Sequence, residues 1–175
     1  MKQKSFPAPR VDDSAWVAPT AFVSGDVTLE AQVSVWPSAS IRGDMEPIHL
    51  ARGANVQDGA VLHTSYGFPM QIEQKVTIGH AAVVHSATRV GEGTLVGMNA
   101  TVLDGAEVGK GCLIAAGAVV TPGTKVPDHS LVAGIPGKVV RTDENLYEMN
   151  MENYRSYLEL GEQYKKGKWP VHRPG

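Results

Sequence analysis

The sequence predicts an all-β solenoid, a parallel β-helix built from hexapeptide repeats, followed by one C-terminal α-helix. Three observations predict it: a six-residue period of aliphatic residues, small residues at a fixed offset from them, and a change of composition near residue 142. The 175 residues suffice for one hydrophobic core. We expect a β-helix domain over residues 1–141 with coils from about 17 to 135, a packed helix over 142–166 and a tail over 167–175.

The aliphatic period is the strongest of these signals. From Ile72 onward every sixth residue is aliphatic: Ile72, Ile78, Val84, Val90, Val96, Val102, Val108, Ile114, Val120, Val126 and Val132. Two earlier blocks have the same period: Val17, Val23, Leu29, Val35 and Ile41, then Leu50, Val56 and Leu62. A helix repeats near 3.6 residues, so it cannot produce this pattern. A period of six is typical of a β-helix, in which each hexad forms one side of a three-sided coil.

Two irregularities separate the three blocks. Three extra residues lie between Ile41 and Leu50, and four lie between Leu62 and Ile72. We expect both insertions to loop out of the coil, because the period resumes unchanged after each of them.

Small residues occupy the position two before most of the aliphatic ones. They are Ala82, Thr88, Thr94, Ala100, Ala106, Cys112 and Ala118. Residues two apart in a strand face the same side, so both positions should point into the coil. The residues between are expected to turn, with Gly91, Gly97, Asn99 and Gly109 as turn residues. Cys112 is thus expected to fill the core.

The repeat ends in the segment from Ala133 to Gly137, and the composition then changes to Glu, Tyr, Leu and Met. Thr142 or Asp143 could cap the start of a helix. An approximate apolar stripe, Leu146, Met149, Tyr157, Leu158 and Leu160, would pack this helix on the solenoid. Residues 165–175 are expected to form a loose tail.

Composition excludes several classes of function. The formal charge of −2 offers no basic surface for nucleic acid or an anionic membrane. One cysteine cannot form an intramolecular disulfide. No apolar run reaches the length of a membrane span, and residues 1–13 lack the apolar region of a signal peptide. We therefore expect a soluble, cytoplasmic protein that binds neither nucleic acid nor membrane.

The positions of the histidines in the repeat suggest a site. With three hexads to a coil, the residues after Ile41, Leu62 and Val84 share one edge of the prism, and these are Arg42, His63 and His85. They should stack at the spacing of about 4.8 Å between neighbouring strands. Two histidines at that spacing could chelate one metal ion.

A third histidine, His80, falls on a different edge, together with Gln57 and Asp58 of the preceding coil. One side of the coil is about 17–20 Å long, so His80 cannot reach His63 and His85 in the same chain. A neighbouring copy could supply it in a closed ring, and a three-sided prism suits a trimer. Spacing alone leaves two interpretations open, a metal site shared between subunits and ordinary structural histidines.

Several segments then resemble one known family. Arg42-Gly43-Asp44, Asn55-Val56-Gln57-Asp58, Leu62-His63 and Gly79-His80 followed by His85 resemble the signature of the γ-class carbonic anhydrases. The resemblance extends from Val17 to Arg141. It implies a left-handed β-helix and a homotrimer with a metal at each interface. The metal would be held by His63 and His85 of one chain and by His80 of its neighbour.

The resemblance also implies a chemistry and further site residues. Three imidazoles leave an open position on Zn²⁺, and Fe²⁺ or Co²⁺ would fit the same ligands. A metal-bound hydroxide would attack carbon dioxide to give bicarbonate. The implied roles are as follows: Gln57 orients the attacking oxygen, Arg42 and Asp44 tie the subunit edges together, Asn55 and Asp58 support the ligands, and Tyr154 approaches from the helix.

Two departures from the family pattern bear on activity. The acidic insertion of the well-known active members is reduced here to Met45-Glu46-Pro47, and His85 is followed by Ser86-Ala87 where many relatives have Gly-Cys. The first departure favours, as an alternative, a metal-binding homologue without hydrase activity or acting on another substrate such as a thioester. The segment from Ala133 to Lys138 also resembles the end of hexapeptide acyltransferases, which is a second alternative.

Overall fold

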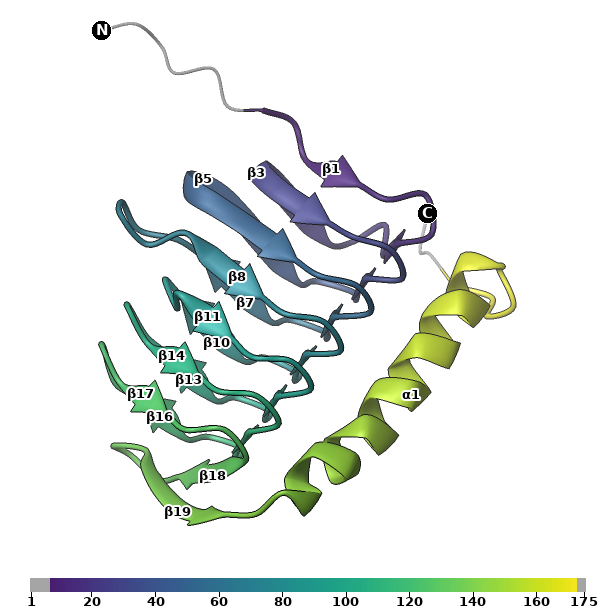
Figure 1. Cartoon of the computed structure of the whole chain (residues 1–175). Coiled ribbons are helices and arrows are strands. Elements are labelled where there is room, and N and C mark those ends of the chain that lie inside the picture. Colours follow the sequence, from purple (N-terminus) through teal and green to yellow (C-terminus); the bar gives the residue numbers. More distant parts are fainter. Residues whose placement is uncertain (1–6, 173–175) are drawn as a thin grey trace, which may run out of the picture.

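The computed structural model describes residues 7–172 as a left-handed parallel β-helix with one long α-helix along its side (Figure 1). The chain winds around a three-sided prism, and we number the sides in the order in which the chain meets them from β2 onward. The predicted fold class is thus confirmed. The tail residues 173–175 and residues 1–6 of the predicted domain lie outside the described part.

Each side is a stack of short parallel strands. Side 1 consists of β2 (Trp16–Val17), β4 (Ser34–Val35), β6 (Asn55–Val56), β9 (Thr77–Ile78), β12 (Leu95–Val96), β15 (Leu113–Ile114) and β18 (Ser130–Ala133). Side 2 consists of the first parts of β3 (Phe22–Leu29) and β5 (Ser40–Leu50), then β7 (Val61–His63), β10 (Val83–His85), β13 (Thr101–Val102) and β16 (Val119–Val120). Side 3 consists of β1 (Arg10–Val11), the second parts of β3 and β5, then β8 (Met70–Ile72), β11 (Arg89–Val90), β14 (Glu107–Val108) and β17 (Lys125–Val126).

The predicted aliphatic residues form the core. From Leu29 to Val132 none of them is more than 5% exposed, whereas Val17 and Val23 of the first coil are only half-buried. The small positions are buried too, apart from Thr88, in whose place Ala87 is buried. The exception arises because the corner after His85 turns one residue early, at Ser86, which has a φ of 52°. Burial raises the pKa of the Cys112 thiol, in agreement with its expected role as core filler.

The turn residues correct one expectation. Asn99 does adopt the left-handed conformation, with a φ of 56°, but Gly91, Gly97 and Gly109 do not. These three positions instead require glycine because the backbone of the next coil passes too close to leave room for a side chain. A Cβ on Gly91 would lie 2.5 Å from the carbonyl carbon of Gly109.

The C-terminal end of the solenoid is closed by an unexpected strand. β19 (Lys138–Thr142) pairs antiparallel with β18. It is followed by α1 (Asn145–Lys165), which runs back along side 1 toward the first coils (Figure 1). Thr142 lies in the strand, while the Asp143 side chain accepts a hydrogen bond from the Asn145 N–H.

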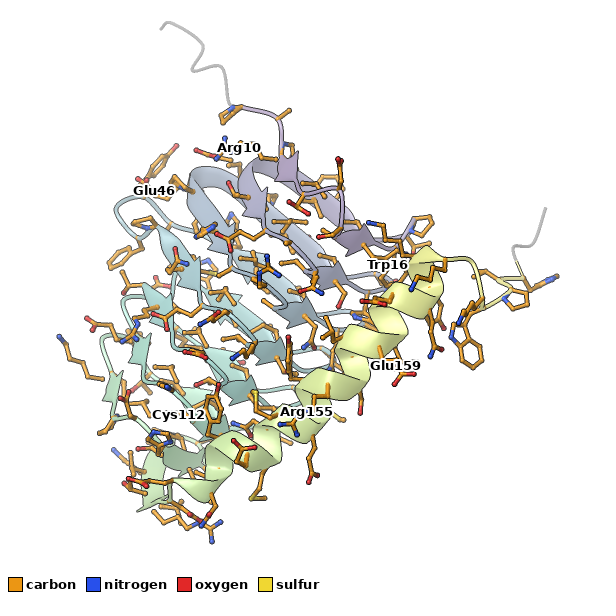
Figure 2. All side chains as sticks on the ribbon, turned by 45° about the vertical axis from the view of Figure 1, so that its right-hand side comes forward. Arg10, Trp16, Glu46, Cys112, Arg155 and Glu159 are labelled. Atoms are coloured by element: carbon orange, nitrogen blue, oxygen red, sulfur yellow. The ribbon has the colours of Figure 1, made fainter. Side chains whose placement is uncertain are left out.

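The packed face of α1 differs from the predicted stripe. Its buried residues are Leu146, Asn150, Met151 and Gly161, whereas Met149 is 54% exposed. The stripe was wrong at Met149 because Asn150 takes the inward position, where its amide donates to the carbonyls of Gly93 and Cys112. Figure 2 shows Trp16 beside the last turns of the helix, and there it contacts Tyr164.

The segment after α1 is not loose where it is described. The ring of Trp169 stacks on Tyr164, with centroids 6.1 Å apart, and its indole N–H donates to Gln163. The expectation of a loose tail is therefore wrong up to Trp169, because the chain turns back on the helix at Gly167. No helix in the described part of the chain is both long and apolar enough to cross a membrane.

Candidate metal centre

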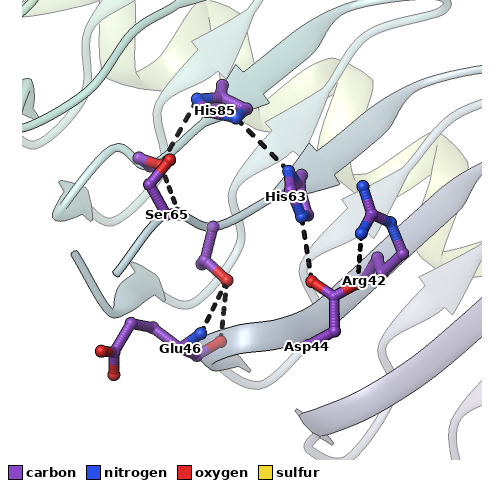
Figure 3. A network of polar contacts seen from close by, with 8 residues as sticks. Arg42, Asp44, Glu46, His63, Ser65 and His85 are labelled. Atoms are coloured by element: carbon purple, nitrogen blue, oxygen red, sulfur yellow. Dashed lines mark hydrogen bonds and ion pairs between the residues drawn. The ribbon is translucent and has the colours of Figure 1, made fainter. Parts of the chain in front are cut away.

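His63 and His85 lie side by side at the corner between sides 2 and 3. Strands β7 and β10 pair in parallel with His85 opposite His63, and Arg42 lies opposite His63 in the preceding coil. The predicted stack of Arg42, His63 and His85 is therefore confirmed. The Nδ1 atom of His63 is 3.3 Å from the Nε2 atom of His85 (Figure 3).

The outward ring nitrogen of each histidine contacts a carboxylate. Nε2 of His63 lies 3.0 Å from Asp44, which also binds Arg42. Nδ1 of His85 lies 2.6 Å from Asp104. Partial burial opposes ionisation of Asp44, but hydrogen bonds from Arg42 and His63 outweigh it and lower the pKa of this carboxyl. The Asp44 carboxylate is thus available as an acceptor.

This arrangement fixes which nitrogens carry protons. A carboxylate can only accept, so each outward nitrogen donates, and in a neutral imidazole the other nitrogen then carries a lone pair. With both rings neutral, the lone pairs of His63 Nδ1 and His85 Nε2 therefore face each other, and a shared cation would satisfy both. Two ligands of a tetrahedral metal, at bond lengths of about 2.0–2.1 Å, are roughly 3.3–3.4 Å apart. The observed 3.3 Å fits that separation.

His80 lies at the corner between sides 1 and 2, as its place in the repeat predicts. It follows β9, which pairs with β6, so Gln57 and Asp58 lie in the coil before it. Its Nδ1 lies 3.1 Å from Asp58, and its Nε2 lies 3.0 Å from the Tyr157 hydroxyl. Within residues 7–172 of one chain, no three His, Cys, Asp or Glu side chains are grouped so that they could hold a metal ion.

Two of the remaining predicted residues, Gln57 and Asn55, lie in the coil before His80. Gln57 is 2% exposed, and its amide donates to Asn55, which in turn donates to Thr77. Tyr154 lies elsewhere: its ring packs against Gly53, where a Cβ would be 2.9 Å from its hydroxyl. The helix tyrosine that contacts His80 is Tyr157.

Two partners of the histidines escaped the sequence reasoning, Asp104 and Tyr157. Asp104 could have been found from the repeat, because it lies two residues after Val102, in the coil that follows His85. Tyr157 had no such signal, because the repeat does not extend into the helix and cannot give its register against side 1.

The two insertions leave the regular coil as predicted, the first as a bulge within β5 and the second as the loop between β7 and β8, and they are joined to each other. The Thr64 hydroxyl accepts from the Glu46 N–H and donates to the Glu46 carbonyl. The Glu46 carboxylate accepts from the N–H of Gly67, and in Figure 3 it points away from His63 and His85. Glu46 therefore holds the two insertions together. The carboxylates in contact with the histidine pair are instead Asp44 and Asp104.

Comparison with known proteins relates the chain to two groups. Residues 87–122 match the model of the bacterial transferase hexapeptide (six repeats). A probable carbonic anhydrase of Methanocaldococcus jannaschii is 51% identical over 148 residues, covering 83% of this chain and 92% of that protein. A carbonic anhydrase of Geobacillus kaustophilus is 41% identical over 159 residues, covering 90% and 86%.

A solved structure gives the second comparison. A putative acetyltransferase of Bacillus cereus superposes with a TM-score of 0.87 at 36% identity, covering 90% of this chain and 92% of that one. The fold is thus shared between relatives named for different activities, so the argument for function rests on the site.

Proposed function

The chain belongs to the γ-carbonic anhydrase-like family of hexapeptide-repeat proteins, and we propose that it catalyses the reversible hydration of carbon dioxide to bicarbonate at a metal site shared between subunits. One observation carries this proposal. The facing nitrogens of His63 and His85 are 3.3 Å apart, and each ring is held from its other side by a carboxylate. Ligating histidines in metal sites typically have such carboxylate partners.

The proposed ligands are His63 and His85 of one chain and His80 of an adjacent copy. Zn²⁺ suits three imidazoles and is our proposed metal, while Fe²⁺ and Co²⁺ would accept the same set. When bound, the metal supplies Lewis acidity that brings the pKa of water near 7 and so provides hydroxide at neutral pH.

The protein's own residues would then position the reaction. Asp44 and Asp104 hold the protons on the outward nitrogens of the histidine pair, which keeps the inward nitrogens free as ligands. Asp58, 3.1 Å from His80 Nδ1, would favour the proton on that nitrogen by its charge. Gln57, buried in the coil before His80, would use its amide to orient the attacking water, and Asn55 fixes that amide by accepting from it.

A homotrimer would bring the two corners together, and the outer surfaces of the prism support it. The outward residues of side 2 are largely apolar: Phe22, Val61, Val83 and Val119. Those of side 3 form ion pairs, including Arg89–Glu73 and Lys125–Glu107. Exposed apolar surface of this kind favours an interface, and His63 and His85 lie at the end of side 2.

A second candidate function is suggested by the position of Glu46. Its carboxylate is bonded to Gly67 and points away from the histidines, so the insertion supplies no free carboxylate to carry protons from the site. A metal-binding homologue with weak or no hydration, or one acting on another substrate such as a thioester, would have this arrangement. The acyltransferase alternative has in its favour the hexapeptide-repeat match and the similarity to a putative acetyltransferase, neither of which bears on the site.

The test is stopped-flow carbon dioxide hydration on protein whose metal content per chain is measured in the same sample. We expect chelator-sensitive turnover at about one metal per chain, lost in His85→Ala. The matched control is His49→Ala, because His49 lies on side 3 and is bonded to Glu30 and Gln71. Full metal occupancy without hydration would instead establish the second candidate. Hydration that persists in His85→Ala without metal would refute both.

A further inference from the structure

His80 differs from the other two histidines in that neither of its ring nitrogens faces another histidine. Nδ1 faces Asp58 at 3.1 Å, and Nε2 meets the Tyr157 hydroxyl at 3.0 Å. His63 and His85 each have one nitrogen on a carboxylate, and their other nitrogens face each other. If His80 is a ligand, one of its two contacts must break when the metal binds.

The chemistry of the two partners shows which contact breaks. Asp58 is a carboxylate 3.1 Å from Nδ1, and its negative charge favours a proton on that nitrogen over a lone pair. In the neutral imidazole, Nε2 then has the lone pair, and Tyr157 donates to it. The Tyr157 hydroxyl thus occupies the same lone pair that a metal ion would use.

Tyr157 is held firmly in this place. Its ring packs edge-on against Trp36, with centroids 5.1 Å apart and planes at 86°. Trp36 is itself fixed by a hydrogen bond to Ser34 and by contacts with Trp16 and Tyr164.

We propose that Tyr157 is a placeholder for the metal at His80: it donates to Nε2 in the unloaded chain, keeps the ring oriented with Nδ1 on Asp58, and gives up Nε2 when the metal binds. This inference rests on the proposed metal site. Tyr157 is thus a positioning residue that acts through His80, and its hydroxyl competes with the metal.

The competition has a measurable consequence. Removing the hydroxyl frees Nε2 before the metal arrives, so Tyr157→Phe should bind metal more tightly. The gain should be about three- to tenfold, the effect of one net hydrogen bond. Tyr154→Phe is the matched control, because it removes a hydroxyl one turn earlier on the same helix, at Gly53 rather than at His80.

The experiment is a Zn²⁺ titration of the metal-free full-length protein against a competing chelator, for the wild type, both tyrosine variants, His80→Ala and the double variant His80→Ala/Tyr157→Phe. We expect tighter binding in Tyr157→Phe, an unchanged Kd in Tyr154→Phe, and weaker binding in His80→Ala. The gain should vanish in the His80→Ala background, because coupled residues are not additive.

The outcomes separate the two proposals. An unchanged or weaker Zn²⁺ affinity in Tyr157→Phe, with His80→Ala weakened, would overturn the placeholder role and leave the shared site intact. Wild-type affinity in His80→Ala would overturn the shared site itself. Nitrogen NMR of the metal-free wild type gives an independent check: His80 should be the Nδ1–H tautomer with a hydrogen-bonded Nε2, and Tyr157→Phe should lose that bond. The opposite tautomer would refute the inference.

Discussion

The two histidine-bearing corners of the prism are built differently. At the corner between sides 2 and 3, two histidines from successive coils face each other at 3.3 Å, and their outward nitrogens contact Asp44 and Asp104. At the corner between sides 1 and 2, a single histidine has its two ring nitrogens in contact with Asp58 and Tyr157 of its own chain. The first corner has two ring nitrogens whose lone pairs converge. At the second corner, the lone pair of His80 Nε2 already accepts a hydrogen bond from Tyr157.

This difference shows why a single chain would hold only part of the proposed site. The parallel ladder stacks equivalent positions of the repeat along one edge, so it can stack two ligands but cannot bring in a third from another edge. A three-ligand site then requires the two corners to come from different copies. The following predictions test this complementarity, beginning with the largest effect.

Mixing two inactive variants should restore activity. His63→Ala and His80→Ala should each lose chelator-sensitive hydration, because each removes one of three ligands. After co-refolding, an interface between a His80→Ala chain that supplies His63 and His85 and a His63→Ala chain that supplies His80 has a complete set. We expect metal binding and hydration to return to a fraction of the interfaces, measured on the mixture and on each variant alone. Mixtures as inactive as their components would contradict a shared site.

A charge on side 2 should break the assembly. Phe22 is 57% exposed in the single chain, so Phe22→Glu should cost little folding stability. At an interface it would bury an unpaired carboxylate, at a cost of several kcal/mol. We expect loss of the trimer in light scattering. Lys125→Glu, on the equivalent outward position of side 3, is the control and should leave the mass unchanged; equal behaviour of the two variants would argue against side 2 as the contact.

The carboxylate partners should have a smaller effect on the metal than the ligands do. Asp104→Asn keeps the shape of the side chain but weakens the hold on the His85 Nδ1 proton, so Zn²⁺ affinity should fall about 10- to 100-fold. Asp44→Asn should act similarly through His63. The measurement is chelator competition on the refolded, metal-free protein. Unaltered affinity in Asp104→Asn would mean that this contact serves only the fold.

The ion pairs of side 3 should have the smallest effect. A hydrogen bond from Arg89 outweighs partial burial and lowers the pKa of Glu73 below its ordinary value of 4.5. Glu73 therefore stabilises the fold above about pH 4.5, and this contribution is lost as the pH falls through its lowered pKa. The pair is half-exposed, so the expected contribution is at most about 1 kcal/mol. The melting temperature should fall slightly less between pH 7 and pH 3 in Glu73→Gln than in the wild type. An identical dependence on pH in the two proteins would show that the pair contributes nothing to stability.

Much of the solenoid could be predicted from the sequence because its six-residue repeat depends only on spacing along the chain. Six residues make one side, so counting alone predicted that His85 lies opposite His63 and that His80 lies on another edge, and the strand pairing bears out both. Counting also placed Arg42 under His63. Counting could not predict that the corner after His85 turns one residue early, at Ser86. As a result, Ala87 rather than Thr88 lies in the core.

The helix and the side-chain partners were beyond that rule. Met149 faces outward although it is apolar, because Asn150 finds two backbone carbonyls to bond. Tyr157, three residues after Tyr154, reaches His80 because the helix register against side 1 depends on packing between Trp16, Trp36 and Tyr164. Nothing in the sequence indicated that Glu46 bonds to Thr64 and Gly67 and so joins the two insertions.

By itself, then, the sequence determined the repeat, the three sides and the edges on which the histidines lie, because each depends on spacing along the chain. Only the tertiary structure decided what each ring nitrogen contacts, since Asp104, Asp58 and Tyr157 come from other coils and from α1. A periodic backbone sets the height and edge of a residue. The direction of a side chain and its hydrogen-bond partner depend on segments that come together only when the chain is folded.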